Sequence, residues 1–288
     1  MVVSHEKIIC PPLTSDRACV AYLFRKRWPH GFQCSFCGAL QKEMPAAPTV
    51  VCKYCRKLNS ITARTLMHGT KKSLVAWMIV AWQFCLRKQG MSAKELQRLM
   101  ELSCYQTAWS WLQKIRRGAT LAESDKCRGT VIINTVPLTV ATTRHGHIPE
   151  IVYVLELDHF NHPPGNRVRF SLVKQHGTIT ANTLAKMVEK EADILIHDPQ
   201  KIPLLMSRHH TPMPCNNEQR SQSEYLFTTM ETWLNAVYRR SINIKHLQSY
   251  LNEFAFRYNT SSWPDNFTIF DHLVGGLISF SDPKEALP

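Results

Sequence analysis

Two cysteine pairs of identical spacing constrain the fold of this chain more than any other feature. Cys34 and Cys37 form one C-x2-C pair, Cys52 and Cys55 form the other, and 14 residues separate the inner cysteines. Four thiolates arranged in this way commonly hold one Zn²⁺ ion at the centre of a tetrahedron. The spacing predicts a zinc ribbon over residues 15–66, with two redox pairs or a chance arrangement as the alternative.

The predicted zinc site is structural, because four cysteine ligands leave no coordination position open for a substrate. Ten cysteines in a chain of 288 residues, without a secretory signal in residues 1–30, favour a reducing compartment over a disulfide framework. The most apolar segment, residues 74–86, has 13 residues and is too short to span a bilayer. We therefore expect a cytoplasmic protein without a membrane partner.

The positive charge of the chain lies in its first part. Residues 1–128 contain 21 basic and 7 acidic side chains, a net charge of +14, whereas residues 129–288 contain 14 basic and 15 acidic ones, a net charge of −1. Such asymmetry is typical of a segment that binds a polyanion, most often nucleic acid. A basic surface that is merely solvated is the alternative. Arg56 and Lys57, beside the second cysteine pair, are candidates for contacts with phosphate groups.

Residues 70–118 have the pattern of helices that contact DNA. An apolar helix is predicted over 73–88. A second helix is predicted over 92–100, capped by Ser92 with Glu95 at the capping-box position, and a third over 104–117, capped by Ser103 and ending before Gly118. The last two have helix-turn-helix spacing, and a plain helical hairpin is the alternative. The outer face of the third helix is predicted to carry the candidate DNA contacts Tyr105, Gln106, Gln113, Lys114, Arg116 and Arg117.

The second part of the chain predicts a mixed sheet covered by helices. Strands are expected over 130–136, 151–157, 168–173 and 194–197, and helices over 180–191, 222–238 and 245–257, with a loop over 199–221. The predicted domain covers residues 128–262 and leaves 263–288 as a C-terminal tail. The fold class expected for the whole chain is α+β and multidomain.

Several segments resemble bacterial insertion-sequence transposases that begin with a zinc ribbon. They are RWPHGF (27–32), the cysteine pairs, SITARTLMH (60–68), GMSAKELQ (90–97), YQTAW (105–109) and KHLQSYLNEFAFRYN (245–259). The resemblance implies an α/β ribonuclease-H-like domain whose DDE acidic triad binds two Mg²⁺ or Mn²⁺ ions and catalyses DNA transposition, a form of DNA recombination. It further implies a nucleoid-associated homo-oligomer that joins the terminal inverted repeats of an insertion sequence to target DNA.

In this family the triad has one acid on the first strand, one after the fourth strand and one on the following helix. The resemblance assigns the second place to Asp198 and the third to Glu224, which precedes Phe227 by three residues and is predicted to point with it toward the sheet. Asn134 stands where the first acid is expected. A neutral amide offers a pair of metal ions one oxygen and no charge, so we expect the strand-transfer chemistry to be impaired.

Two other functions stay open at this point. Glu156 or Asp158, on the second predicted strand, would serve as a substitute metal ligand in an active transposase. Alternatively, the zinc ribbon and the helix-turn-helix would belong to a DNA-binding regulator whose second domain serves only for dimerisation.

Overall fold

The computed structural model describes residues 13–139, 148–159, 165–173, 181–198, 212–238 and 242–279. The chain divides into two compact units, the first made of residues 1–87, 93–122 and 265–288 and the second of 88–92 and 123–264. A cluster of cysteines, helices and a mixed sheet place the chain in the α+β class, as predicted. Within the described ranges, no helix combines the length and the apolar character that a bilayer span requires.

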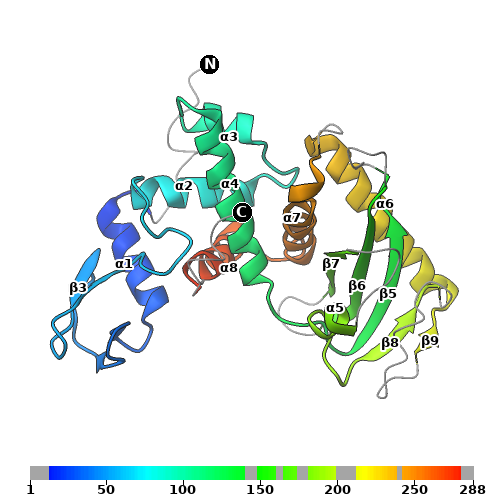
Figure 1. Cartoon of the computed structure of the whole chain (residues 1–288), viewed down its shortest axis with the longest axis horizontal. Helices are drawn as coiled ribbons and strands as arrows, with labels where there is room; N and C mark the ends of the chain where they lie inside the picture. The colour runs from blue at the N-terminus through cyan, green and yellow to red at the C-terminus, as the bar shows by residue number, and fades with distance from the viewer. Residues whose placement is uncertain are drawn as a thin grey trace. The chain divides into compact units, whose positions relative to one another are not determined.

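The first unit begins with one helix and two short β-ladders (Figure 1). Helix α1 (Asp16–Arg27) is capped by Ser15, whose Oγ accepts a hydrogen bond from Ala18 N. The ladders pair β1 (Phe32–Gln33) with β2 (Leu40–Gln41), and β3 (Thr49–Val51) with β4 (Leu58–Ser60). Each cysteine pair lies in the turn between the two strands of one ladder, so the ladders fix the positions from which the thiols project.

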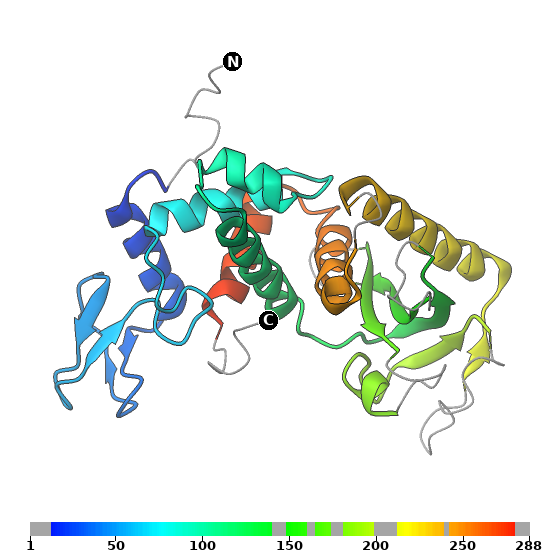
Figure 2. The same ribbon diagram turned by 45° about the horizontal axis from the view of Figure 1, so that its top comes forward.

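Four further helices complete the described part of the first unit (Figure 2): α2 (Leu74–Leu86), α3 (Ala93–Leu99), α4 (Tyr105–Ala122) and α8 (Asn266–Ile278). The three helices predicted between residues 73 and 117 are confirmed, and Ser73 Oγ caps α2 by accepting from Ala76 N. Two expectations differ from the structure. α4 continues through Gly118 to Ala122, and a helix forms within 263–288, where we expected a tail.

Close contact between α4 and α8 explains the unexpected course of α4. A Cβ atom placed on Gly276 of α8 would lie 1.9 Å from the carbonyl oxygen of Gly118, and one placed on Gly118 would lie 2.5 Å from Leu277 Cδ2. The two glycines therefore let the helix backbones touch. Gly118 resembles a helix stop in the local sequence, but its role is set by a partner more than 150 residues away, which local start and stop rules cannot detect.

The second unit is built on a mixed sheet, as predicted, but the sheet has five strands where four were expected. The strands β5 (Thr130–Pro137), β6 (Glu150–His159), β7 (Gly165–Leu172), β8 (Asp193–Ile196) and β9 (Met213–Pro214) have the order β7-β6-β5-β8-β9. β5, β6 and β7 are antiparallel neighbours, whereas β8 runs parallel to β5, and β9 parallel to β8. β9 was not predicted, because it is a two-residue edge strand inside a segment rich in loop-forming residues.

Helices cover the two faces of this sheet unequally: α5 (Ala181–Ala185), α6 (Asn217–Tyr238), the 3₁₀ turn η3 (Ile244–His246) and α7 (Leu247–Asn259). Alternate β5 residues separate two apolar clusters. Ile132 belongs to the larger one, formed with α6 and α7, and Ile133 belongs to the smaller one, formed with α5. Figure 1 shows α6 and α7 beside the sheet.

Two helix boundaries in the second unit were predicted wrongly. The helix expected over 180–191 ends at Ala185 within the described residues, because Cys127 N donates to Met187 O and Glu189 N donates to Cys127 O, which pulls the chain into an extended pairing. α6 begins at Asn217 and not at 222, inside the predicted loop. Asn216 and Gln219 cap it reciprocally, each side chain accepting from the other residue's backbone N–H at 2.9 Å. Residues 199–211 of that loop lie outside the described residues.

Candidate functional site

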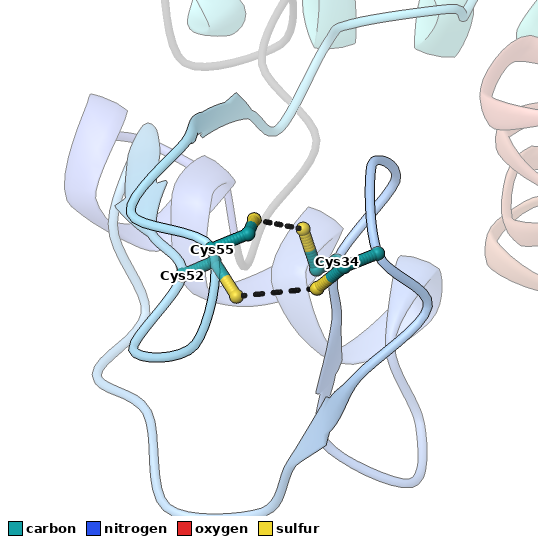
Figure 3. Close-up of side chains that lie close together, drawn as sticks. Cys34, Cys52 and Cys55 are labelled. Carbon is teal, nitrogen blue, oxygen red and sulfur yellow. Dashed lines mark hydrogen bonds between the residues drawn. The ribbon is translucent and has the colours of Figure 1, made fainter.

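The four predicted zinc ligands lie together at the tips of the two ladders. Cys34 Sγ is 3.6 Å from Cys55 Sγ, Cys37 Sγ is 3.7 Å from Cys52 Sγ, and all four sulfur atoms lie within 4.8 Å of one another (Figure 3). In a ZnS₄ tetrahedron with bonds of about 2.3 Å, the sulfur atoms are about 3.8 Å apart. The donor atoms and their spacing therefore fit one Zn²⁺ ion held only by thiolates, which supports a structural zinc.

The buried side-chain amides of Gln41 and Asn59 hydrogen-bond to the thiols, and nothing in the cysteine spacing predicts them. Gln41 Nε2 donates to Cys52 Sγ at 3.2 Å, while Gln41 Oε1 accepts from Lys53 N. Asn59 Nδ2 donates to Cys34 Sγ at 3.6 Å, while Asn59 Oδ1 accepts from the backbone and hydroxyl of Ser35. Each ladder thus contributes an amide that holds the opposite cysteine pair. Cysteine spacing carries no signal for such partners, which orient metal ligands from outside the coordination sphere.

The hydrogen bonds around the cluster favour the thiolate form of Cys34 and Cys52. The backbone N–H of Lys57 favours a thiolate at Cys55 as well, but burial and the three neighbouring thiols outweigh it and raise the pKa of Cys55 to about 11. Burial opposes ionisation of Cys34, but backbone N–H groups of Cys37 and Phe36 and the amide of Asn59 outweigh it and lower its pKa to about 6. The pKa of Cys52 is also lowered, because backbone N–H groups of Cys55 and Tyr54 outweigh its burial. These donors stabilise negative charge on sulfur before any metal binds.

The two cysteine turns have the same backbone form. Gly38 and Arg56 each follow the second cysteine of a pair, each donates its N–H to the carbonyl of the first cysteine, and both have a positive φ, 73° and 58°. Glycine adopts a positive φ at no steric cost, which suits Gly38 to this turn. Arg56 has the same left-handed conformation although it is not glycine, so its backbone is modestly strained. Its side chain is exposed.

A basic surface surrounds the second cysteine turn. Lys53, Arg56 and Lys57 are exposed there, together with the rings of Tyr54 and Phe36, and Lys57 Nζ lies 4.8 Å from the centre of the Phe36 ring. From residue 44 to residue 94 the sequence contains no Asp or Glu, so no carboxylate of this segment neutralises the surface. The exposure of Arg56 and Lys57 is compatible with their predicted contacts to phosphate groups.

The DNA-contacting face predicted for α4 is partly wrong. Tyr105 and Gln106 are exposed, and Lys114 and Arg117 are partly exposed, but Gln113 and Arg116 are 6% and 2% exposed. Both buried side chains lie beside Leu112 and Ile115, on the helix side that packs inward, so neither reaches the base edges of a bound duplex. A polar residue next to an apolar stripe can lie on the buried or on the exposed side of the helix, and the sequence pattern does not show which.

The cap of α4 is Cys104 and not the predicted Ser103. Backbone N–H groups of Thr107 and Gln106 donate to the Cys104 thiol and lower its pKa. Sequence rules favour Ser, Thr, Asp and Asn at such positions, so a capping cysteine is easily missed.

We expect this cap to make Cys104 the fastest-reacting thiol among the described cysteines outside the zinc cluster, because Cys19, Cys85, Cys127 and Cys215 are buried. A lowered pKa leaves more thiolate at a given pH, so alkylation of Cys104 continues as the pH falls below the range in which an ordinary cysteine stops reacting. Mass-spectrometric mapping of iodoacetamide alkylation between about pH 6 and pH 9 measures this. A Cys104 rate that follows that of an unfolded peptide would contradict it.

Asn134, the predicted first triad position, belongs to a buried polar network. Asn134 Nδ2 donates to Tyr153 Oη at 3.0 Å across the β5–β6 pair, and Tyr153 Oη lies 2.6 Å from Ser223 Oγ and 3.0 Å from Ser223 O of α6. Asn134 is 5% exposed. Its amide nitrogen is therefore engaged between the sheet and α6.

Glu224 has a different orientation from the predicted one. Its side chain is 67% exposed, and Ser223 is the residue at the start of α6 that faces the sheet, followed by Leu226, Met230 and Leu234. Phe227 lies at the edge of that buried stripe and not at its centre. The three-residue spacing from Phe227 therefore predicts the wrong direction for the Glu224 side chain. Glu224 Oε1 lies 3.4 Å from Nε2 of His197, the residue before Asp198, so α6 does meet the end of β8.

Glu156, one of the two predicted substitute acids, is not placed to complete the triad. Glu156 is buried and pairs with Arg167 at 3.9 Å. It alternates with Leu155 along β6 and so faces the smaller apolar cluster, whereas Asn134 alternates with Ile133 and faces the larger one. The side chain of Asp158 lies outside the described residues. Among the described residues, the four cysteines are the one group of three or more metal-binding side chains that come together.

Comparison with known proteins identifies the zinc ribbon. Residues 14–58 match the family model of the transposase zinc-ribbon domain, IS1595 type. The match covers α1 and both cysteine pairs, and it suggests a DNA-binding protein of transposase type. No curated protein and no solved structure matches the chain.

Proposed function

We propose that this protein binds the terminal inverted-repeat DNA of a mobile element through its first unit. The observation that carries the proposal is the four-thiol cluster inside a segment that matches the transposase zinc-ribbon domain. The net charge of +14 over residues 1–128 supports it, because neutralising phosphates releases counterions from the duplex. Copies of the chain would assemble on the DNA, since two ends must be brought together.

The proposal includes a ribonuclease-H-like second unit whose DDE chemistry is impaired. Support for the fold comes from the sheet, in which three antiparallel strands are followed by a fourth strand parallel to the first and hydrogen-bonded to it. The side chains do not fit a pair of Mg²⁺ or Mn²⁺ ions. Asn134 adds no charge, its amide nitrogen is bonded to Tyr153, and the Glu224 side chain is 67% exposed beside His197. The three positions Asn134, Asp198 and Glu224 therefore do not supply the ligands that such a metal pair requires.

DNA binding is tested by fluorescence anisotropy with the zinc-loaded full chain and a labelled duplex from the element's end. We expect a linear fall of log K with log salt, with a slope of about −5 or steeper if six or more phosphates are contacted. A duplex of scrambled sequence should bind at least about tenfold more weakly. Failure to bind either duplex at low salt would overturn the proposed function.

The impaired chemistry is tested by Asn134→Asp. A carboxylate supplies the charge that a metal pair needs, so we expect Mn²⁺-dependent nicking of bound DNA to rise at least about tenfold from a very low wild-type rate, equivalent to about 1.4 kcal/mol of barrier. The buried carboxylate should also lower stability by about 1–3 kcal/mol, because it cannot donate to Tyr153. Asn134→Ala is the control without charge. Robust wild-type nicking that disappears in Asp198→Ala would show that the chemistry is intact.

A further inference from the structure

A shallow groove lies in the first unit between residues 70–77 and the first half of α4. Its volume is about 310 Å³, and the polar side chains along it include Thr70, Lys72, Gln106, Ser110 and Lys114. None of the described residues that line the groove carries a carboxylate, so no acid among them neutralises its two ammonium groups. Residues 106, 110 and 114 follow one another at intervals of four and form one stripe along α4.

We propose that this groove holds a backbone phosphate of duplex DNA, with Lys72 and Lys114 as its cationic ligands. The inference rests on the proposed function and deepens it, because it assigns part of the DNA interface to the segment that follows the ribbon. Phosphate contacts fix the register and orientation of a protein on the duplex. A phosphate seated between residue 72 and α4 would thus align the stripe of Gln106 and Ser110 with the DNA.

Ring packing and two hydrogen bonds hold the floor of the groove in place. The indole rings of Trp77 and Trp111 are 2% and 5% exposed and meet edge to face, with their centroids 5.3 Å apart. Trp77 Nε1 donates to Thr70 Oγ1 at 2.9 Å, and Lys72 N donates to the same oxygen at 3.1 Å. These bonds fix residues 70–72 against α2, so the site does not have to be ordered when DNA binds.

Two donors at this groove have no acceptor among the residues that the structure describes. The hydroxyl oxygen of Thr70 already accepts two hydrogen bonds, so both of its lone pairs are used. The one further hydrogen bond that this hydroxyl can make is the donation of its own proton. The buried indole N–H of Trp111, which lines the groove, has no hydrogen-bond partner in the described part of the chain. The indole nitrogen can only donate a hydrogen bond. A ligand rich in oxygen atoms, or a water molecule bound to such a ligand, would provide the acceptor that this N–H lacks. A phosphodiester supplies anionic oxygens and no donor of its own.

The test compares two double variants of equal charge in the anisotropy titration. Lys72→Gln with Lys114→Gln removes both proposed ligands, whereas Lys71→Gln with Lys94→Gln removes two exposed lysines that do not line the groove. We expect the groove variant to bind at least about tenfold more weakly at 0.1 M salt and its salt slope to become shallower by about 2. The control variant should lose less than about threefold in affinity.

The result separates the two proposals. Equal losses in both variants, or an unchanged groove variant that is folded by circular dichroism, would overturn the phosphate site while leaving DNA binding intact. Absence of wild-type binding would overturn the proposed function itself. Adding inorganic phosphate as a competitor at constant ionic strength shows whether the groove binds a free phosphate ion or a phosphate of the DNA backbone. Competition by phosphate at low millimolar concentration would indicate a binding site for a free anion and would contradict a site specific for the phosphates of duplex DNA.

Discussion

Removal of zinc is expected to unfold the ribbon and to abolish DNA binding. Cys52 is fully buried, and the ladders around it have only two or three residue pairs each, too few to fold without the metal. Structural zinc sites contribute about 10–16 kcal/mol of binding free energy, which becomes folding free energy for a small segment. Cys52→Ser should therefore lose the bound zinc and expose residues 32–60 to proteolysis.

Elemental analysis and limited proteolysis measure this effect. We expect one zinc per wild-type chain, and none in Cys52→Ser or after treatment with a strong chelator. Cys104→Ser is the matched control, because Cys104 is exposed and lies outside the cluster. It should retain zinc and the protease resistance of the ribbon. A zinc-free wild-type protein with an intact ribbon would rule out the structural role of the metal.

Gly276→Ala is expected to destabilise the first unit by about 3 kcal/mol or more. The new Cβ would lie 1.9 Å from Gly118 O and 2.7 Å from Ala122 N, and both atoms belong to the backbone of α4. These backbone atoms cannot move away by rotating about a side-chain bond, so the two helices must separate and lose part of their packing. Urea unfolding, followed by circular dichroism, measures the change.

The neighbouring glycine provides the control. A Cβ on Gly275 would meet only the end of the Lys26 side chain, at 3.7 Å. Gly275→Ala should be neutral or stabilise α8 by up to about 1 kcal/mol, because alanine favours a helix over glycine. Equal stability of the two variants would mean that α4 and α8 do not touch through their glycines.

The features that the sequence predicted well are those with local causes. The ligands Cys34, Cys37, Cys52 and Cys55 follow from spacing alone, because the chemistry of zinc fixes the number and type of its donors. The helices and the strands β5 to β8 follow from apolar periodicity. The amides of Gln41 and Asn59 could not be predicted, since each acts on a cysteine pair of the other ladder.

Errors arose where a side chain's environment depends on distant residues. Gln113 and Arg116 lie beside the apolar stripe of α4, and their burial depends on what packs against that edge. Glu224 was placed from Phe227, but the buried stripe of α6 passes through Ser223, one residue earlier. The identity of Asn134 was informative from the sequence, whereas its bond to Tyr153 required the pairing of β5 with β6.

The central claim is that a DNA-binding first unit is joined to a second unit that does not hold a catalytic metal pair. Anomalous diffraction from crystals of the zinc-loaded protein soaked in Mn²⁺ tests this most directly. We predict one strong zinc peak among the four cysteine sulfur atoms and no manganese peak beside Asn134, Asp198 and Glu224. Two manganese ions bound by these three residues would contradict the account.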